Sequence, residues 1–178
     1  PIVFRGDRLE NFNIYDYSSG NEITLDYADS ITGQWRGIHF FGAKESTIEH
    51  TIIKNAVVGI QIDTLSANEF VNLNKVKIEN SLAAALITRG ANVRAENCLF
   101  GSGGQYSAAI TIGGDLTFNH CTFGNYDSGG SFRKTPALLV KNYFEDKFEN
   151  NIPRPFDQAV FINSIIYGNI DNELEIDT

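Results

Sequence analysis

Few residues in this sequence have the types and spacing that catalysis requires. Hydrolysis of a glycosidic bond needs two carboxyl groups facing one substrate, and calcium-assisted chemistry needs clustered acids. Glu49 and Glu96 are the acids best placed for such work, but neither has an acidic partner at the matching position of the neighbouring repeat described below. We therefore expect no catalytic residue, no cofactor and no metal.

Two histidines, His50 and His120, occupy equivalent positions of the repeat. Lys75 and Asn97 stand between them at that position, and Ser164 lies beyond. At one strand spacing of about 4.8 Å per repeat, the two imidazoles are roughly 14 Å apart, too far to share a metal ion. We interpret this row as polar turn residues.

Cys98 and Cys121 lie one repeat apart in a row that is expected to point inward. Neighbouring parallel strands bring Cα atoms close enough for a disulfide, although the two side chains point the same way. Cysteine in a core usually acts as a small apolar residue. We predict two buried free thiols, with a disulfide or redox pair as the alternative.

Three segments interrupt the repeat, at residues 5–34, 126–136 and 141–157. Aromatic and Arg side chains tend to carry binding energy, and these segments gather them. The second and third flank residues 137–140, so we expect them to emerge close together. The predicted partner-binding surface consists of Phe132, Arg133, Tyr143, Phe144 and Phe148.

Two features of these segments have alternative interpretations. The Phe side chains of the third segment either form a platform for carbohydrate or cover outward-pointing Leu86 and Leu139. An alternating acidic run near the C-terminus either binds calcium or forms a solvated edge, and we favour the solvated edge. The run consists of Asp171, Glu173, Glu175 and Asp177.

Short strands separated by turns must position all of these residues. Ile, Val, Phe, Thr, Asn and Gly are frequent, as in β-proteins with tight turns. A first column of segments consists of a small residue followed by a strand, at intervals of 22, 25, 25 and 28 residues. Its members are 37–40, 59–62, 84–87, 109–112 and 137–140, and 1–4 is a further member. Its predicted outward side chains are His39, Gln61, Leu86, Thr111 and Leu139.

A second column lies between these segments, at 48–55, 73–80, 95–102, 118–125 and 162–169. One shared position holds Thr51, Val76, Cys98, Cys121 and Ile165, and another holds Ile53, Ile78, Phe100, Phe123 and Tyr167. An Asn or Ser closes each segment, which suits a left-handed bend. The matching positions make a repeat architecture the natural interpretation.

Alternation of period two excludes a helical repeat. A single repeat cannot bury its own inward side chains, so successive repeats must stack. The predicted fold is all-β: one domain, residues 1–178, forming a right-handed parallel β-helix of about six coils of 22–25 residues with loop excursions. The left-handed type requires a hexapeptide repeat, which is absent.

Net charge limits the class of partner. At −8, with scattered basic residues, the chain is not expected to bind nucleic acid. Its apolar runs are too short to span a bilayer. The sequence begins at Pro1 and contains no Met, so we expect a fragment of a longer solenoid. Membrane attachment is expected only through an anchor outside this fragment.

Three segments carry a resemblance to a known family. Residues 34–38 (QWRGI), 46–56 (STIEHTIIKNA) and 161–169 (FINSIIYGN) resemble right-handed parallel β-helix repeat proteins, and among them surface lipoproteins of Bacteroidetes-type bacteria. The resemblance implies a secreted or outer-membrane-associated module and says little about activity; the absence of paired outward acids favours a module that is not an enzyme. Such a module binds a polysaccharide or a surface protein, or is a structural part of a surface assembly. The alternative is a polysaccharide lyase or glycosidase whose catalytic coils lie outside this fragment.

Overall fold

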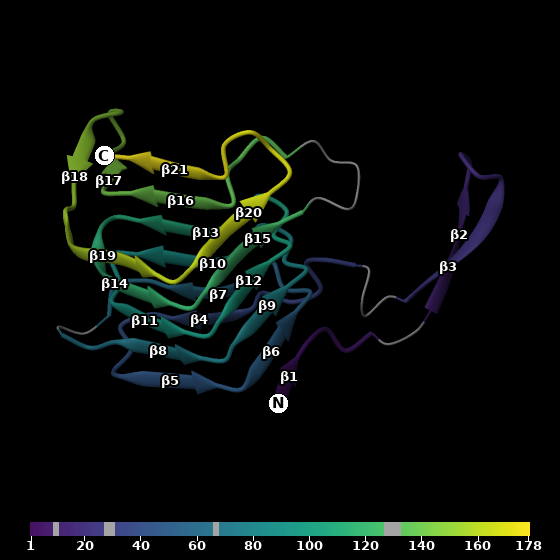
Figure 1. The fold of residues 1–178 in the computed structure, drawn as a ribbon, viewed down its shortest axis with the longest axis horizontal. Coiled ribbons are helices and arrows are strands. Elements are labelled where there is room, and N and C mark those ends of the chain that lie inside the picture. The colour runs from purple at the N-terminus through teal and green to yellow at the C-terminus, as the bar shows by residue number, and fades with distance from the viewer. Residues whose placement is uncertain (9–10, 27–30, 66–67, 127–132) are drawn as a thin grey trace.

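The computed structural model describes residues 1–8, 11–26, 31–65, 68–126 and 133–178. Within these ranges the fold is all-β, without helices, and most strands form three parallel sheets (Figure 1). The prediction of an all-β chain with parallel, consecutively paired strands is confirmed. No helix in the described part of the chain is long and apolar enough to cross a membrane.

Within each of the three sheets, neighbouring strands follow one another in sequence order. Sheet 1 contains β1 (Ile2–Phe4), β6 (Thr51–Lys54), β9 (Lys77–Glu79), β12 (Leu99–Gly101), β15 (Thr122–Asn125) and β20 (Ile165–Gly168). Sheet 2 contains β4 (Ile38–Phe40), β7 (Val58–Ile62), β10 (Ala84–Arg89), β13 (Tyr106–Thr111), β16 (Leu138–Lys141) and β21 (Leu174–Asp177). Sheet 3 contains β5 (Ser46–Glu49), β8 (Val71–Asn74), β11 (Val93–Glu96), β14 (Gly114–Asn119) and β19 (Phe156–Ile162).

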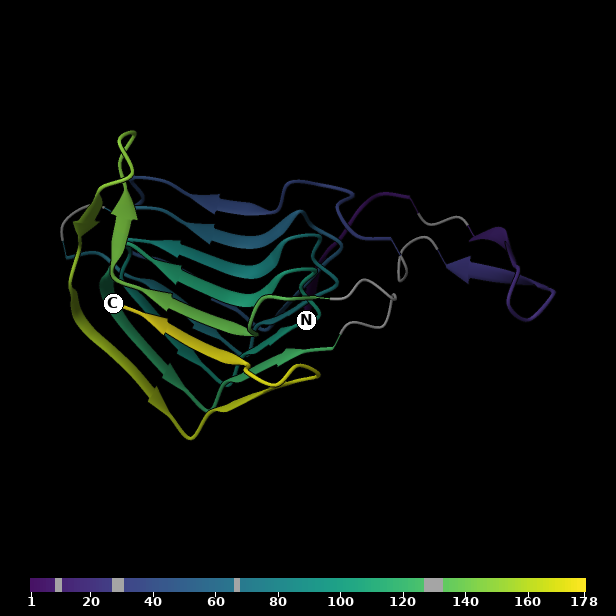
Figure 2. The ribbon, with the colours of Figure 1, turned by 90° about the horizontal axis from the view of Figure 1, so that it is seen from above.

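The chain visits sheets 2, 3 and 1 in turn, and we call one such passage a repeat. Figure 2, viewed from above, shows the three sheets around a shared interior. Two antiparallel hairpins interrupt this order. The hairpin of β2 (Asn11–Asp16) and β3 (Asn21–Asp26) lies between β1 and β4, and the hairpin of β17 (Tyr143–Glu145) and β18 (Asn151–Pro153) lies within the last repeat, between β16 and β19. The β2–β3 hairpin stands away from the three sheets in both views.

Like side chains stack on like in the interior. Ile53, Ile78, Phe100 and Phe123 follow one another across sheet 1 and are fully buried. The rings of Phe100 and Phe123 stack at 5.2 Å between centroids. In sheet 3, Phe118 stacks on Phe161 at 5.1 Å. Because each repeat covers the inward row of the next, the core is continuous.

Left-handed residues turn the chain from sheet 3 to sheet 1. One residue per repeat has a φ between 48° and 54°, at His50, Lys75, Asn97, His120 and Asn163. The backbone N–H at this corner still donates to the next repeat; for example, His50 N lies 3.0 Å from Asn74 O. The histidines are therefore turn residues, as predicted, and Asn163 rather than Ser164 completes their row.

Small residues are required where the chain enters sheet 2. A Cβ added to Gly59 would lie 2.2 Å from Ile78 Cγ2 and 2.6 Å from the Ala85 carbonyl oxygen. The corner therefore has no room for a side chain larger than those present. The pairing register places Ala85, Ser107 and Ala137 in line with Gly59, so small residues do recur here. Ala84 and Ala109 of the predicted column, however, are offset by one and two residues.

The first strand lies in a different sheet from the one predicted. Residues 1–4 were assigned to the first column, but β1 pairs with β6 of sheet 1, with Phe4 opposite Ile53. The Phe4 and Trp35 rings lie 6.4 Å apart. Pro-Ile-Val-Phe alternates equally well in either column, so the pattern could not distinguish the two sheets.

Three register predictions are wrong. Thr111 was expected in the outward row beside Leu139, but Ala109, two residues earlier, pairs with Leu139, and Thr111 pairs with Arg89.

The other two register predictions are wrong by one residue. Leu86 pairs with Ile60 and is fully buried, and Ile87 takes the outward position beside Gln61. In the last repeat, Ile166 rather than Tyr167 pairs with Phe123, so Tyr167 points outward. A shift of one residue moves every side chain to the other face of a strand. Both segments are apolar at consecutive positions, so alternation could not fix their register.

We predict that Gly59→Ala destabilises the fold by about 1–3 kcal/mol, because the added methyl group overpacks the corner against Ile78. The matched control is Gly124→Ala in β15, where the nearest atom to the new Cβ is 3.9 Å away. Urea unfolding should show a lower midpoint for Gly59→Ala and an unchanged or raised one for the control. Equal effects of the two substitutions would contradict the steric explanation.

Candidate binding surfaces

The outward face of sheet 3 carries two aligned polar rows. Backbone pairing places Thr47, Asn72, Arg94 and Thr117 side by side in one row. The second row consists of Glu49, Asn74, Glu96 and Asn119. Seven of these residues line a shallow concavity of about 420 Å³, and Thr47 is the one that does not. Four successive repeats thus present hydrogen-bonding side chains at regular spacing.

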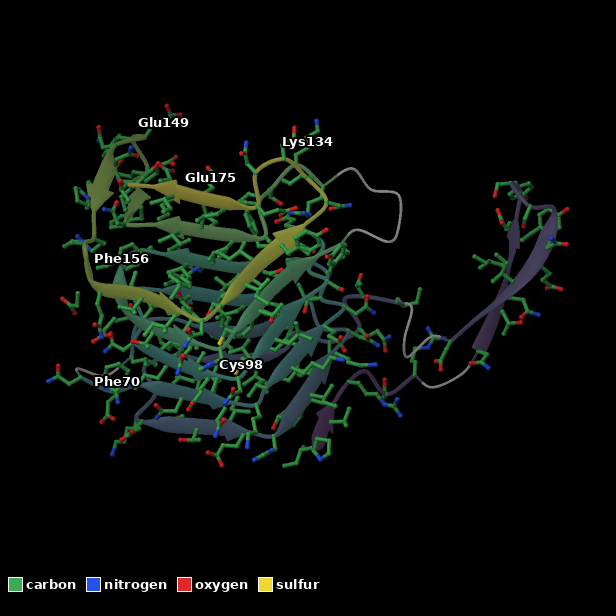
Figure 3. The ribbon with its side chains drawn as sticks, in the orientation of Figure 1. Phe70, Cys98, Lys134, Glu149, Phe156 and Glu175 are labelled. Atoms are coloured by element: carbon green, nitrogen blue, oxygen red, sulfur yellow. The ribbon has the colours of Figure 1, made fainter. Side chains whose placement is uncertain are left out.

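Most of these polar groups are available to a ligand. Among the described residues, the side chains of Glu49, Asn74, Glu96 and Thr117 make no hydrogen bond to another protein group. The Arg94 guanidinium lies 3.9 Å from the centroid of the Phe70 ring, which immediately precedes β8 (Figure 3). The face therefore combines free donors and acceptors with a half-buried aromatic ring.

The two glutamates on this face are not neighbours. Asn74 lies between Glu49 and Glu96 in the pairing register. The prediction that neither has an acidic partner in the adjacent repeat is confirmed. Two strand spacings separate them, about 9.6 Å between backbones.

The predicted partner-binding residues Tyr143, Phe144 and Phe148 lie together on the β17–β18 hairpin. Phe148 is 72% exposed. Each ring has a cation near its face: Lys141 at 3.9 Å from Tyr143, Arg154 at 5.1 Å from Phe144 and Lys147 at 4.8 Å from Phe148. Tyr143 Oη also donates to Asp177 Oδ2 at 2.6 Å. These rings are therefore already partnered within the chain.

Arg133 lies elsewhere. It precedes β16 whereas the hairpin follows it, and Figure 3 shows Lys134 and Glu149, which mark the two segments, at opposite ends of that strand. The structure therefore places the two segments at opposite ends of β16 and does not bring them together there. Phe132 lies outside the described residues. Whether the hairpin binds a partner stays a prediction.

Arg133 is a buried structural residue. Its Nη2 donates to Glu173 Oε1 at 2.6 Å and to the Asn125 carbonyl oxygen at 3.0 Å. Glu173 in turn accepts the backbone N–H groups of Ala137 at 2.9 Å and Ile170 at 2.8 Å. The pair thus connects the segment before β16 to the segment before β21. The sequence predicted that Glu173 lies on an outward acidic face, but its side chain pairs with Arg133 and is mostly buried. Glu175 and Asp177 follow it on β21.

The two cysteines are buried free thiols, as predicted. Cys98 Sγ donates to the Glu96 carbonyl oxygen at 3.2 Å, and Cys121 Sγ to that of Asn119 at 3.5 Å. Thr51 Oγ1 occupies the same position and donates to Glu49 O at 2.7 Å. The row therefore holds a small donor beside the corner in each of these three repeats, and Val76 takes the same position in the repeat between Thr51 and Cys98. The Cys121 sulfur and burial raise the pKa of the Cys98 thiol, so its thiolate is disfavoured.

One cluster was missed in the sequence. His39 Nε2 lies 2.8 Å from Asp63 Oδ2, and Gln61 Nε2 lies 3.1 Å from both carboxylate oxygens. His39 and Gln61 were predicted to point outward, but Asp63 follows β7 and was not included in the column. Extending the alternation by one residue would have placed it on the same face. No group of three or more His, Cys, Asp or Glu side chains in the described ranges is arranged to hold a metal ion.

Comparisons with protein-family models, with curated proteins and with solved structures gave no match to this chain.

We predict that Glu173→Gln lowers the free energy of unfolding by about 3 kcal/mol at neutral pH, because it leaves the Arg133 charge buried without its partner. The control is Glu145→Gln, which removes an exposed partner of Lys141 and should change stability by less than about 1 kcal/mol. Urea unfolding at several pH values measures both.

The effect should also depend on pH. Burial opposes ionisation of Glu173, but hydrogen bonds from Arg133 and from the Ile170 backbone hold its pKa below the ordinary value of 4.5. A depressed carboxyl pKa stabilises the fold above the unfolded pKa, and this contribution disappears as pH falls through the folded pKa. The difference in free energy of unfolding between wild type and Glu173→Gln should therefore shrink as the pH falls through the pKa of Glu173 in the folded protein. A pH-independent difference would contradict this account.

Proposed function

We propose that the chain is a right-handed parallel β-helix that acts as a non-catalytic binding module, with a glycan chain as the ligand of sheet 3. Two observations support the β-helix. Successive strands pair in register within each sheet, and the chain passes through sheets 2, 3 and 1 in the same order in each repeat. The observation that carries the function is the pair of aligned polar rows on sheet 3, with the concavity that they line.

The chemistry of this face suits sugars. Amide, carboxylate, guanidinium and hydroxyl groups are the donors and acceptors that match sugar hydroxyls. Neighbouring strands are about 4.8 Å apart, close to the length of one sugar residue in an extended chain. A polysaccharide lying along the stack would therefore meet a similar set of groups at each residue. Glu49 and Glu96, both in the second row, favour neutral sugars over acidic ones.

The same proposal includes a location. The segments that resemble surface lipoproteins support a protein that is secreted or displayed on the outer membrane, where polysaccharides are abundant. Attachment through an anchor outside this chain belongs to the same proposal.

We predict that a glycan array, followed by calorimetry on the glycans that bind, detects at least one neutral polysaccharide ligand. Asn74→Ala combined with Arg94→Ala should weaken binding at least tenfold, equivalent to about 1.4 kcal/mol. The matched control is Lys77→Ala on the outward face of sheet 1, which also removes a cation and breaks only an exposed pair with Glu79. Unchanged affinity of the double variant would contradict the assignment to sheet 3.

The polysaccharides that bind in this experiment also test the alternative function, in which the chain is an enzyme. Incubation with each polysaccharide that binds should release no unsaturated or reducing ends above a heat-inactivated sample. Glu49 and Glu96 lie two strand spacings apart, which is farther than the separation of about 5–5.5 Å in a retaining glycosidase pair and at the upper limit of about 9.5 Å for an inverting pair. Release that is lost in Glu96→Gln would instead favour a lyase or glycosidase.

A further inference from the structure

A second polar site lies on the outward face of sheet 2, where the first two repeats meet. His39 of β4 and Gln61 of β7 are neighbours in the pairing register. Both contact Asp63, whose side chain is only 18% exposed. A carboxylate accepts hydrogen bonds only, so the contact with Oδ2 places a proton on His39 Nε2. Asp63 thereby fixes the orientation of the imidazole ring, and Nδ1 remains for another partner.

The negative charge of Asp63 is already balanced within the chain. Arg89 Nε lies 4.0 Å from Asp63 Oδ1, on the side of the carboxylate that belongs to the next repeat. Two hydrogen bonds from Gln61 and one from His39 occupy the remaining lone pairs. Asp63 therefore does not repel an anion that approaches His39 as strongly as an unpaired carboxylate would.

A hollow of about 330 Å³ opens beside this cluster. Its polar lining comes from Arg36, His39 and Gln61, and Val57 and Val58 provide an apolar wall. This combination of a few polar groups with apolar walls is typical of small-molecule sites.

Arg36 is the charged group of the hollow that has no acidic partner. It is exposed, and it forms no ion pair with any carboxylate in the described part of the chain. Gly37 fixes its position: φ at Gly37 is +100°, and an added Cβ would lie 1.6 Å from the Val58 carbonyl oxygen. The backbone at this point is therefore held tightly against the next repeat, with the guanidinium at the rim of the hollow.

An exposed aromatic ring lies beside His39, next to the residues that line the hollow. Phe41 is 77% exposed, and its ring centroid lies 6.2 Å from that of His39. An exposed Phe beside a cationic rim suits a ligand that has an anionic group and a body with an apolar face.

We propose that this hollow binds the carboxylate group of a small organic acid. The planar Arg36 guanidinium matches a carboxylate with two parallel hydrogen bonds, and the oriented His39 ring supplies a further contact. In a chain of net charge −8, the local excess of positive charge from Arg36 and Arg89 over Asp63 favours an anion here. The site is independent of the glycan surface, because it lies on a different sheet.

The test measures binding of two acids with their uncharged counterparts, namely benzoate with benzamide and glucuronate with glucose. Each is titrated into the intact chain, and binding is followed by calorimetry and by the NMR signals of the His39 imidazole. We expect at least one acid to bind and to shift the His39 signals, and its uncharged counterpart to bind at least tenfold more weakly. The acid that binds identifies the body of the ligand, aromatic or sugar.

Variants assign the interaction to this hollow. Arg36→Gln should weaken binding of the acid at least tenfold, and His39→Gln should weaken it several-fold. Arg154→Gln, which removes the same charge from the β17–β18 hairpin, should leave it unchanged. All three residues are exposed, and circular dichroism verifies that each variant is folded. Absence of binding by both acids, equal binding of an acid and its uncharged counterpart, or full affinity of Arg36→Gln would each overturn the proposal.

Discussion

The structure depends on in-register parallel pairing between successive repeats. Equivalent residues of neighbouring strands lie opposite each other, so each inward side chain packs on its equivalent in the next repeat. The Phe100–Phe123 and Phe118–Phe161 stacks are examples. A single repeat exposes its inward row and has no core of its own. The apolar free energy of folding is therefore gained mainly between repeats, and each corner must keep the same geometry to preserve the register.

This requirement accounts for features that otherwise look unrelated. A left-handed residue at the same corner of each repeat keeps the strands of sheets 3 and 1 aligned, and the thiols of Cys98 and Cys121 fit beside that corner as small donors. The tight entry into sheet 2 excludes large side chains at Gly59. The same alignment also creates the outward rows. The rows on sheet 3 and the His39–Gln61 pair on sheet 2 both consist of residues that are distant in sequence and equivalent in the repeat.

The sequence predicted those parts of the fold in which inward and outward positions differ in polarity. The central repeats alternate clearly, and the paired rows of Ile53, Ile78, Phe100 and Phe123 follow as predicted. Prediction failed where both faces are apolar, as at Leu86 and Ile87 or at Ile166 and Tyr167, because only packing can then select the register. It also failed for the binding surface. Arg133 looked like an exposed anchor, but its partner Glu173 lies 40 residues later, and no local pattern connects the two. Asp63 was missed because it lies one residue beyond the strand that aligns it.

Stacking of the repeats in register can be measured as distances between spin labels on one outward row. One label is placed at Val160→Cys and the second at Arg94→Cys, Asn72→Cys or Thr47→Cys, in a chain whose buried thiols are replaced by Cys98→Val and Cys121→Val. These positions are aligned by pairing across sheet 3. The account predicts that the distance measured by pulsed electron paramagnetic resonance rises by about 4.8 Å with each repeat from Arg94 to Asn72 to Thr47. Distances that do not increase in that order would contradict in-register stacking.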